Sequence, residues 1–216
     1  TDGSVGAIWM AYLTAWGGLL DAGELKSGNK VVITAASSSV GIAAIQIAKQ
    51  HQANVIATTT SPDKFEALKE LGADTVILQP REPNEFNDYI EAVKAFTQGQ
   101  GSDLVFDAVA GPASHALIKA SKRGGRIIFH GLLDRRPMDV HAGVLMKRLL
   151  TLKGYTLDQT LNDLTKKSTA IKGVCDGIDR GSLKPTIAKS FTLEHYQSAF
   201  EYLRSNQQLG KVVIHP

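Results

Sequence analysis

Three consecutive serines, Ser37 to Ser39, lie where a strand is expected to turn into a helix. A continuous apolar run at 31–33 precedes them, and apolar positions recur at helical spacing from Val40 onward. The first N–H groups of a helix have no partner inside it and point outward, so a helix N-terminus binds anions. We therefore expect the N–H groups of Ser38, Ser39 and Val40 to face an anion, with the serine hydroxyls as further donors.

The same turn has the spacing of the glycine-rich loop that binds pyrophosphate in dinucleotide-binding folds. Ala36, Ser38 and Gly41 occupy the three positions of G-x-G-x-x-G, and only the last of them is glycine. Alanine and serine are small enough to preserve the turn and the close approach of a phosphate. An ordinary strand-to-helix turn with a serine N-cap has the same pattern, so the motif alone leaves both interpretations open.

A second polar loop follows the next apolar run, at 55–57. Ser61 is expected to cap a helix whose first position is Pro62, which places Lys64 in the first turn. A cation there opposes the helix dipole, which indicates an anion nearby. No acid stands at the strand end to bind an adenosine 2′-hydroxyl. Thr59, Ser61 and Lys64 therefore favour a 2′-phosphate, and NADP(H) over NAD(H); a solvated lysine on an exposed helix face is the alternative.

Titratable residues also follow later strands. His130 comes after the strand predicted at 126–129 and could donate a proton, although a hydrogen-bonded structural histidine is the simpler interpretation. Asp107 ends another strand, where a buried acid and a cofactor ligand are equally good interpretations. The single cysteine, Cys175, excludes an intramolecular disulfide, and we expect it to be a small buried side chain.

Other kinds of site find little support in the sequence. The formal charge of +3 is spread along the chain, no G-x-S-x-G frame surrounds a serine, and no apolar run reaches the ~18 residues of a membrane span. We expect no metal, nucleic-acid or membrane partner, and the cysteine usage favours a reducing, cytoplasmic location. The remaining histidines lack metal-ligand spacing: His51, His115, His141, His195 and His215.

Alternating strands and helices would position these residues. Strands are predicted at 31–33, 55–57, 75–78, 104–106, 126–129 and 150–155, after a first helix at 5–20. Pro112 is expected to open a helix that Gly124-Gly125 stops. This order predicts an α/β fold of Rossmann type, with a doubly wound parallel six-stranded sheet in the order 3-2-1-4-5-6. Its carboxyl edge collects the serine turn, the loop at 58–64 and the strand ends at 109–111 and 130–132.

The domain is predicted to extend over residues 1–216, with a core at about 22–155 and a C-terminal extension at 156–216. Within the extension we expect a helix at 160–179, a strand near Ile187, a helix at 193–203 and a last strand at 212–214. No low-complexity linker separates the two parts.

Several short motifs together resemble one family. They are Tyr12-Leu13-Thr14-Ala15, the segment Ile33–Gly41, Lys64 followed by Leu71-Gly72-Ala73-Asp74, Asp107-Ala108-Val109-Ala110-Gly111, Gly124-Gly125-Arg126 and Gly210-Lys211-Val212-Val213. With these motifs the chain resembles the nucleotide-binding half of the medium-chain dehydrogenase/reductase superfamily, nearest its zinc-free, quinone oxidoreductase-like branch. The resemblance covers nearly every residue.

The resemblance implies NADPH or NADP⁺ as cofactor, with the pyrophosphate at the serine turn and the 2′-phosphate on Lys64. It also implies that Thr14 lies beside the nicotinamide, although a hydroxyl bonded within its own helix is the alternative. Thr14 and His130 are the candidate catalytic residues. The full predicted cofactor set is Thr14, Ser38, Ser39, Val40, Gly41, Thr59, Ser61, Lys64, Val109, Ala110, His130, Gly131 and Leu132.

The sequence departs from the family in three ways. Met10 occupies the position of a zinc-ligating cysteine of zinc-containing members, which argues against a catalytic zinc. Leu78-Gln79-Pro80 stands where close relatives often have an Asn-Tyr pair. Nothing corresponds to the N-terminal catalytic domain of the superfamily, so we expect a cofactor-domain fragment of a longer reductase whose C-terminal helices and strand pack toward that domain.

The implied reaction is hydride transfer from NADPH to a quinone or an α,β-unsaturated carbonyl compound, and we expect this chain alone to be inactive. Relatives dimerise through the free sheet edge, which implies a homodimer through Leu150 to Tyr155. The alternatives are an NADPH-binding module without turnover, like crystallin-like or RNA-binding relatives, and the cofactor domain of a zinc-dependent alcohol dehydrogenase. A methyltransferase is remote because strand two ends without an acid.

Overall fold

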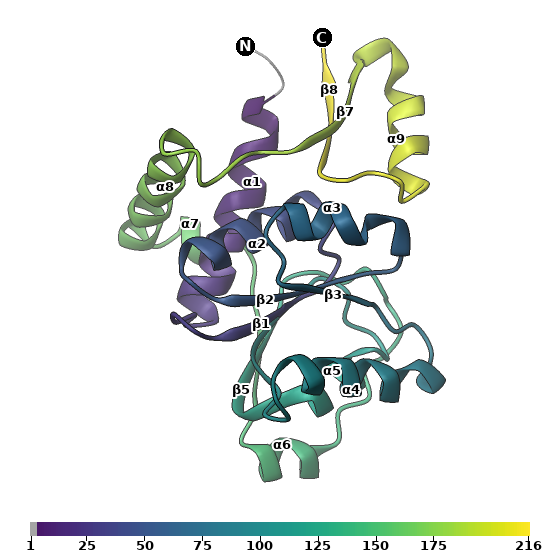
Figure 1. Cartoon of the computed structure of the whole chain (residues 1–216). Coiled ribbons are helices and arrows are strands. Elements are labelled where there is room, and N and C mark those ends of the chain that lie inside the picture. Colours follow the sequence, from purple (N-terminus) through teal and green to yellow (C-terminus); the bar gives the residue numbers. More distant parts are fainter. Residues whose placement is uncertain (1–3) are drawn as a thin grey trace.

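A parallel six-stranded sheet forms the centre of the molecule (Figure 1). The structure, a computed structural model, describes residues 4–216. The strand order is β3-β2-β1-β4-β5-β6, with every neighbouring pair parallel, so the predicted fold is confirmed. The strands are β1 (Lys30–Ile33), β2 (Asn54–Thr59), β3 (Thr75–Leu78), β4 (Ser102–Asp107), β5 (Ser121–Phe129) and β6 (Thr151–Gly154).

Helices cover both faces of the sheet because its central strands are apolar on both sides. On β1, Val31 and Ile33 pack into one core with α1 and α2, whereas Val32 packs into the other with α4 and α5. Figure 1 shows α2 and α3 on one side of the strands and α4 and α5 on the other. The helices are α1 (Ser4–Trp16), α2 (Ser39–Gln50), α3 (Phe65–Glu70), α4 (Phe86–Phe96), α5 (Ser114–Ala120) and α6 (Ala142–Arg148).

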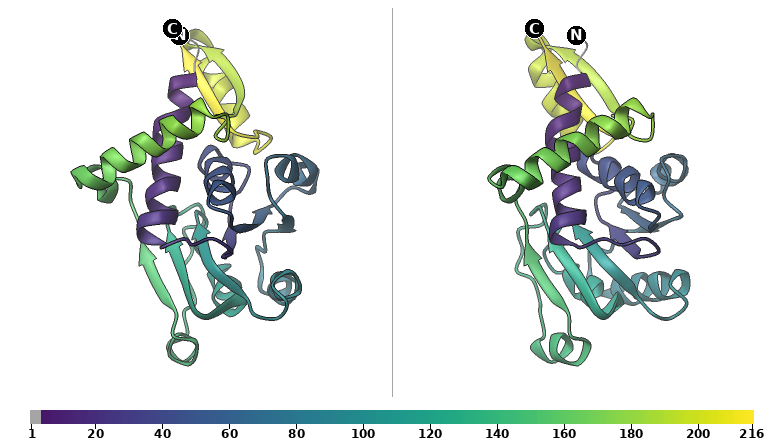
Figure 2. Two further views of the ribbon diagram at one scale, coloured as in Figure 1. Left: turned by 60° about the vertical axis from the view of Figure 1, so that its left-hand side comes forward. Right: turned by 90° about the vertical axis from the view of Figure 1, so that its left-hand side faces the viewer.

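The C-terminal extension forms a second layer beside α1. The helix predicted at 160–179 is divided, because Asp163 caps the start of α8 by accepting hydrogen bonds from the N–H groups of Thr165 and Lys166. Figure 2 shows α8 crossing α1, and β7 pairs in parallel with β8 in a separate two-stranded sheet. The elements are α7 (Asp158–Leu161), α8 (Leu164–Asp179), β7 (Ile187–Thr192), α9 (Tyr196–Arg204) and β8 (Lys211–His215).

A buried glutamine attaches this extension to α2, the helix that begins at the serine turn. Gln46 Oε1 accepts hydrogen bonds from the Tyr12 hydroxyl and from Lys184 N, both at 2.8 Å. Gln46 Nε2 donates to Lys184 O at 3.1 Å. Because a buried amide without partners would be unfavourable, these bonds hold the segment between α8 and β7 at one place on the core.

Several local predictions differ from the structure. The first helix ends at Trp16 and continues as a π-helical segment at Gly17–Ala22. α5 begins at Ser114 rather than at Pro112 and ends at Ala120, so Gly124-Gly125 does not stop a helix. The glycine pair lies within β5, whose pairing with β4 is irregular at that end, and Gly124 has a φ of +79°.

Cys175 is exposed, so the expectation of a buried side chain was wrong. α8 turns Ala170, Val174 and Gly177 toward the core, and Cys175 lies one position away from that face. Within residues 4–216, no helix has the length and apolar character required to cross a bilayer.

Candidate cofactor site

A cleft of about 990 Å³ lies at the carboxyl edge of the sheet, where the predicted site residues were expected to meet. Four of the predicted cofactor residues line it: Ser38, Thr59, Lys64 and Val109. The other predicted residues lie outside its lining: Thr14, Ser39, Val40, Gly41, Ser61, Ala110, His130, Gly131 and Leu132.

The serine turn caps α2 and leaves fewer free donors than the sequence predicted. The Ser38 hydroxyl accepts a hydrogen bond from Gly41 N at 3.0 Å, which makes Ser38 the N-cap. Ser38 N donates to Ala35 O at 2.9 Å within the turn, so the expectation that this N–H faces an anion was wrong. The N–H groups of Ser39 and Val40 have no acceptor one turn earlier inside α2, and they remain the candidate anion donors.

Gly41 allows the turn to pack directly on the helix. A Cβ atom at this position would lie 2.6 Å from the carbonyl oxygens of Ala35 and Ala36, so only glycine fits without a shift. This is the close-packing role of the third glycine in the dinucleotide-binding turn. Ala35 has a left-handed backbone conformation, with a φ of +46°. It directly precedes Ala36, which occupies the position of the first glycine in G-x-G-x-x-G.

Lys64 points into the cleft and is held by three acceptors. Its Nζ donates to Asn206 O at 2.5 Å, to Gln208 O at 2.9 Å and to the Ser37 hydroxyl at 3.3 Å. Partial burial lowers the pKa of Lys64. The alternative of a solvated lysine on an exposed helix face therefore does not describe this residue.

Two glutamines in the cleft have buried amide atoms without partners among the described residues. Gln79 Oε1 accepts a 2.5 Å hydrogen bond from the Thr58 hydroxyl, whereas its Nε2 has no acceptor. Gln208 Oε1 has no donor. A buried unpaired polar group costs about 1–3 kcal/mol, and the groups that pair with an amide N–H and an amide oxygen include phosphate oxygens and hydroxyl groups respectively. The lining thus fits a phosphorylated nucleotide.

The acidic groups in the lining are already paired. Arg136 donates to Asp134 at 2.9 Å and to Glu82 at 3.2 Å. Arg81 and Arg135 also line the cleft. A 2′-phosphate would meet the positive charges of Lys64 and of the neighbouring Arg81, Arg135 and Arg136.

Asp107 is completely buried and organises the loop that follows β4. Its Oδ1 accepts from the Thr34 hydroxyl at 2.6 Å and from Val109 N at 3.0 Å, and its Oδ2 accepts from Ala110 N at 3.0 Å. Ala110 has a φ of +60°, a backbone conformation that these bonds help to fix. Of the two interpretations of Asp107, the structure supports the buried acid and not the cofactor ligand.

His130 and Thr14 are not brought into contact with the cleft. The His130 ring stacks on Phe106 with 3.8 Å between ring centroids and 14° between planes. Burial lowers the pKa of His130 to about 4, so the imidazole is neutral at neutral pH and holds no imidazolium proton. Thr14 is half-buried on α1 and lies outside the lining of the cleft.

The sequence interpretation missed the C-terminal contribution to this site. Asn206 and Gln208 line the cleft although they lie far along the chain from the serine turn. The Gly210-Lys211 motif was recognised as a family feature, but nothing in its local pattern indicated a contact with Ser37 or Ser38. Gln79 was noted only as a departure from the family.

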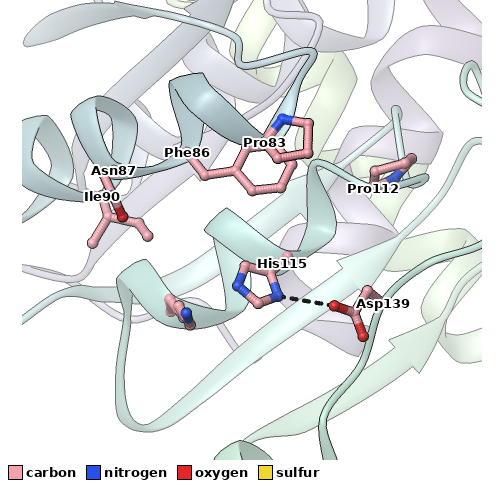
Figure 3. Close-up of a pocket in the computed structure, with 8 residues that line it drawn as sticks. Pro83, Phe86, Asn87, Ile90, Pro112, His115 and Asp139 are labelled. Carbon is pink, nitrogen blue, oxygen red and sulfur yellow. Dashed lines mark ion pairs between the residues drawn. The ribbon is translucent and has the colours of Figure 1, made fainter.

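A second cavity, of about 330 Å³, lies between α4 and α5 (Figure 3). Phe86 stacks on His115 with 5.8 Å between ring centroids, and His115 Nδ1 lies 3.4 Å from Asp139 Oδ2. None of the predicted site residues lines this cavity. Across residues 4–216, no three His, Cys, Asp or Glu side chains come close enough together to hold a metal ion.

Comparison with known proteins places this geometry among oxidoreductases. Residues 39–173 match the family model described as zinc-binding dehydrogenase. The polyketide synthase GfsB of Streptomyces halstedii is 30% identical over 213 residues, which are 96% of this chain and 4% of the synthase. Acryloyl-coenzyme A reductase of Sulfurisphaera tokodaii is 29% identical over 214 residues, 98% of this chain and 58% of that enzyme.

Two solved structures have the same architecture over the whole chain. A quinone oxidoreductase of Pseudomonas syringae pv. tomato matches with a TM-score of 0.87 at 25% identity. A mycobacterial protein complexed with NADPH matches with a TM-score of 0.90 at 22% identity, a likeness of fold. This chain covers 65% of each of them, so it spans only part of these relatives.

Proposed function

Since the chain belongs to the zinc-binding dehydrogenase family, within the medium-chain dehydrogenase/reductase superfamily, we propose that it is the NADPH-binding part of an oxidoreductase. The observation that carries the proposal is the cleft at the carboxyl edge. It combines Ser37 and Ser38 of the serine turn, the Lys64 ammonium and two glutamines with unpaired amide atoms, while its carboxylates are bound to Arg136. This combination suits a phosphorylated dinucleotide.

The proposed substrate is an α,β-unsaturated carbonyl compound, most specifically an unsaturated thioester. Support comes from the acryloyl-coenzyme A reductase and from the polyketide synthases among the relatives. A quinone is the second candidate, supported by the quinone oxidoreductase. When bound, NADPH supplies the hydride. The chain orients the cofactor through the start of α2 and through the loop that Asp107 fixes next to Val109.

The proposal contains no zinc step. The described residues offer no group of three potential ligands, and Met10, at the position of a zinc-ligating cysteine in zinc-containing members, is a 61% exposed thioether. The residues present in this chain therefore do not fit the metal named in the family description.

A titration of the wild-type protein with NADPH and NADH tests the cofactor. NADPH is expected to bind at least ~10-fold more tightly, because a charge-assisted bond to a phosphate contributes about 1.5–3 kcal/mol. Nicotinamide fluorescence or calorimetry measures both affinities. If the protein binds neither NADPH nor NADH, the proposed function is contradicted. Equal affinities for the two dinucleotides would contradict only the 2′-phosphate assignment.

We also propose a homodimer formed through β6, the strand at the free edge of the sheet. Thr151, Lys153 and Gly154 are exposed, and an edge strand with unpaired backbone groups favours pairing with a second copy. Light scattering is expected to give the mass of a dimer. A monomer at high protein concentration would contradict the proposal.

A further inference from the structure

Lys64 connects three segments that are far apart in the sequence. Its own segment is the turn between β2 and α3, Ser37 belongs to the serine turn, and Asn206 and Gln208 belong to the chain between α9 and β8. Figure 1 shows this last segment, in yellow, beside α2 and α3. An ammonium has three N–H donors, and the three acceptors around Lys64 use all of them.

The segment 206–210 has further bonds to the serine turn. Gly210 N donates to Ser37 O at 2.9 Å, and Gly210 forms an isolated parallel bridge with Ser38. On its other side Gly210 lies against Thr186, whose carbonyl oxygen leaves no room for a Cβ atom, and its φ is +101°. The segment is therefore confined between the serine turn and the residues before β7.

We propose that Lys64 is a positioning residue that fastens the segment 206–210 onto the serine turn and so builds one wall of the cleft. Asn206 and Gln208 line the cleft together with Ser37 and Ser38, so the position of this wall determines the shape of the site. The part of this inference that concerns the ligand of the cleft rests on the proposed binding of a nicotinamide dinucleotide.

A lysine that positions this wall and a lysine that only contacts a phosphate have different effects on the binding of NADPH and NADH. A lysine that only binds the 2′-phosphate would affect NADPH and leave NADH unchanged. A lysine that holds the wall affects both dinucleotides, because the unpaired Gln208 Oε1 and the carbonyl groups around it move away from any ligand when the ammonium is lost. NADPH binding then decreases further, because a cation near the phosphate is also removed.

Hydrogen exchange of the ligand-free protein tests the fastening directly. In Lys64→Met, the amides of Gly210 and Lys211 are expected to exchange at least ~10-fold faster than in the wild type, and in Lys64→Arg the increase is smaller because charge and donors remain. Lys69→Met is the matched control, since Lys69 is an exposed lysine of α3 whose bond is to Glu66. Amides of the central strand β1 report whether the fold is intact.

The same variants are then titrated with NADPH and NADH. Lys64→Met is expected to lower NADH affinity about tenfold and NADPH affinity by more, with partial rescue in Lys64→Arg and no change in Lys69→Met. Unchanged exchange at 210–211 in Lys64→Met would overturn the inference, as would a loss confined to NADPH. If the wild type binds neither dinucleotide but exchange changes as expected, the proposed function fails and the fastening role stands.

Discussion

Replacing Asp107 with alanine is expected to lower the free energy of unfolding by about 3–5 kcal/mol, because it removes one partner from a completely buried, hydrogen-bonded group. The Thr34 hydroxyl and the N–H groups of Val109 and Ala110 would lose their acceptor inside the protein. The loop after β4 would no longer be held, and since Val109 lines the cleft, dinucleotide affinity should decrease with stability. Denaturant unfolding and an NADPH titration measure the two effects.

Asp107→Asn separates shape from charge at this position. An amide keeps the size of the side chain but turns an NH₂ group toward a hydrogen-bond donor. We therefore expect the free energy of unfolding of Asp107→Asn to lie between those of the wild type and Asp107→Ala. Asp88→Ala is the matched control, because Asp88 is exposed on α4 and surface changes stay within about 0.5 kcal/mol. An Asp107→Ala protein as stable as the control would show that the carboxylate does not organise the loop.

The sheet could be predicted from the sequence because its signal is local. The inner strands β2, β1, β4 and β5 contain short apolar runs with β-branched residues, and alternate residues enter the two cores, as Val32 and Val31 do on β1. Six such runs between helical segments leave few topologies that satisfy right-handed crossovers. Local patterns gave a wrong prediction where one residue type occurs in two kinds of structure. Glycine pairs often end helices, but Gly124-Gly125 lies within β5.

The candidate site was only partly predictable because the contacts that hold Lys64 join segments far apart in the sequence. The loop before α3 indicated that Lys64 needed partners of opposite charge, and the structure supplies carbonyl oxygens from residues 142 and 144 positions away. No periodicity relates Asn206 and Gln208 to the serine turn. The same limit applies to Asp107, whose partner Thr34 directly follows the neighbouring strand β1 and lies 73 positions away in the sequence.

The second large effect is a loss of stability in mild acid caused by His130. Burial lowers its pKa from an ordinary value of 6.5 to about 4. Above pH 6.5 the imidazole is neutral in both states. Between pH 6.5 and 4 the unfolded chain binds a proton that the folded protein does not, so the free energy of unfolding decreases as pH falls, by about 3 kcal/mol across this window.

The His130→Phe variant isolates this contribution. A phenyl ring can keep the stacking on Phe106 but does not titrate, so the decrease in stability between neutral pH and pH 4.5 should be smaller than in the wild type by about 2 kcal/mol. His51, whose pKa burial also lowers, contributes in the same direction to both proteins and cancels in the comparison. His195→Phe, at an exposed position, is the control. Equal acid sensitivity of the wild type and His130→Phe would mean that folding does not lower the pKa of His130, and its interpretation as a proton donor would regain support.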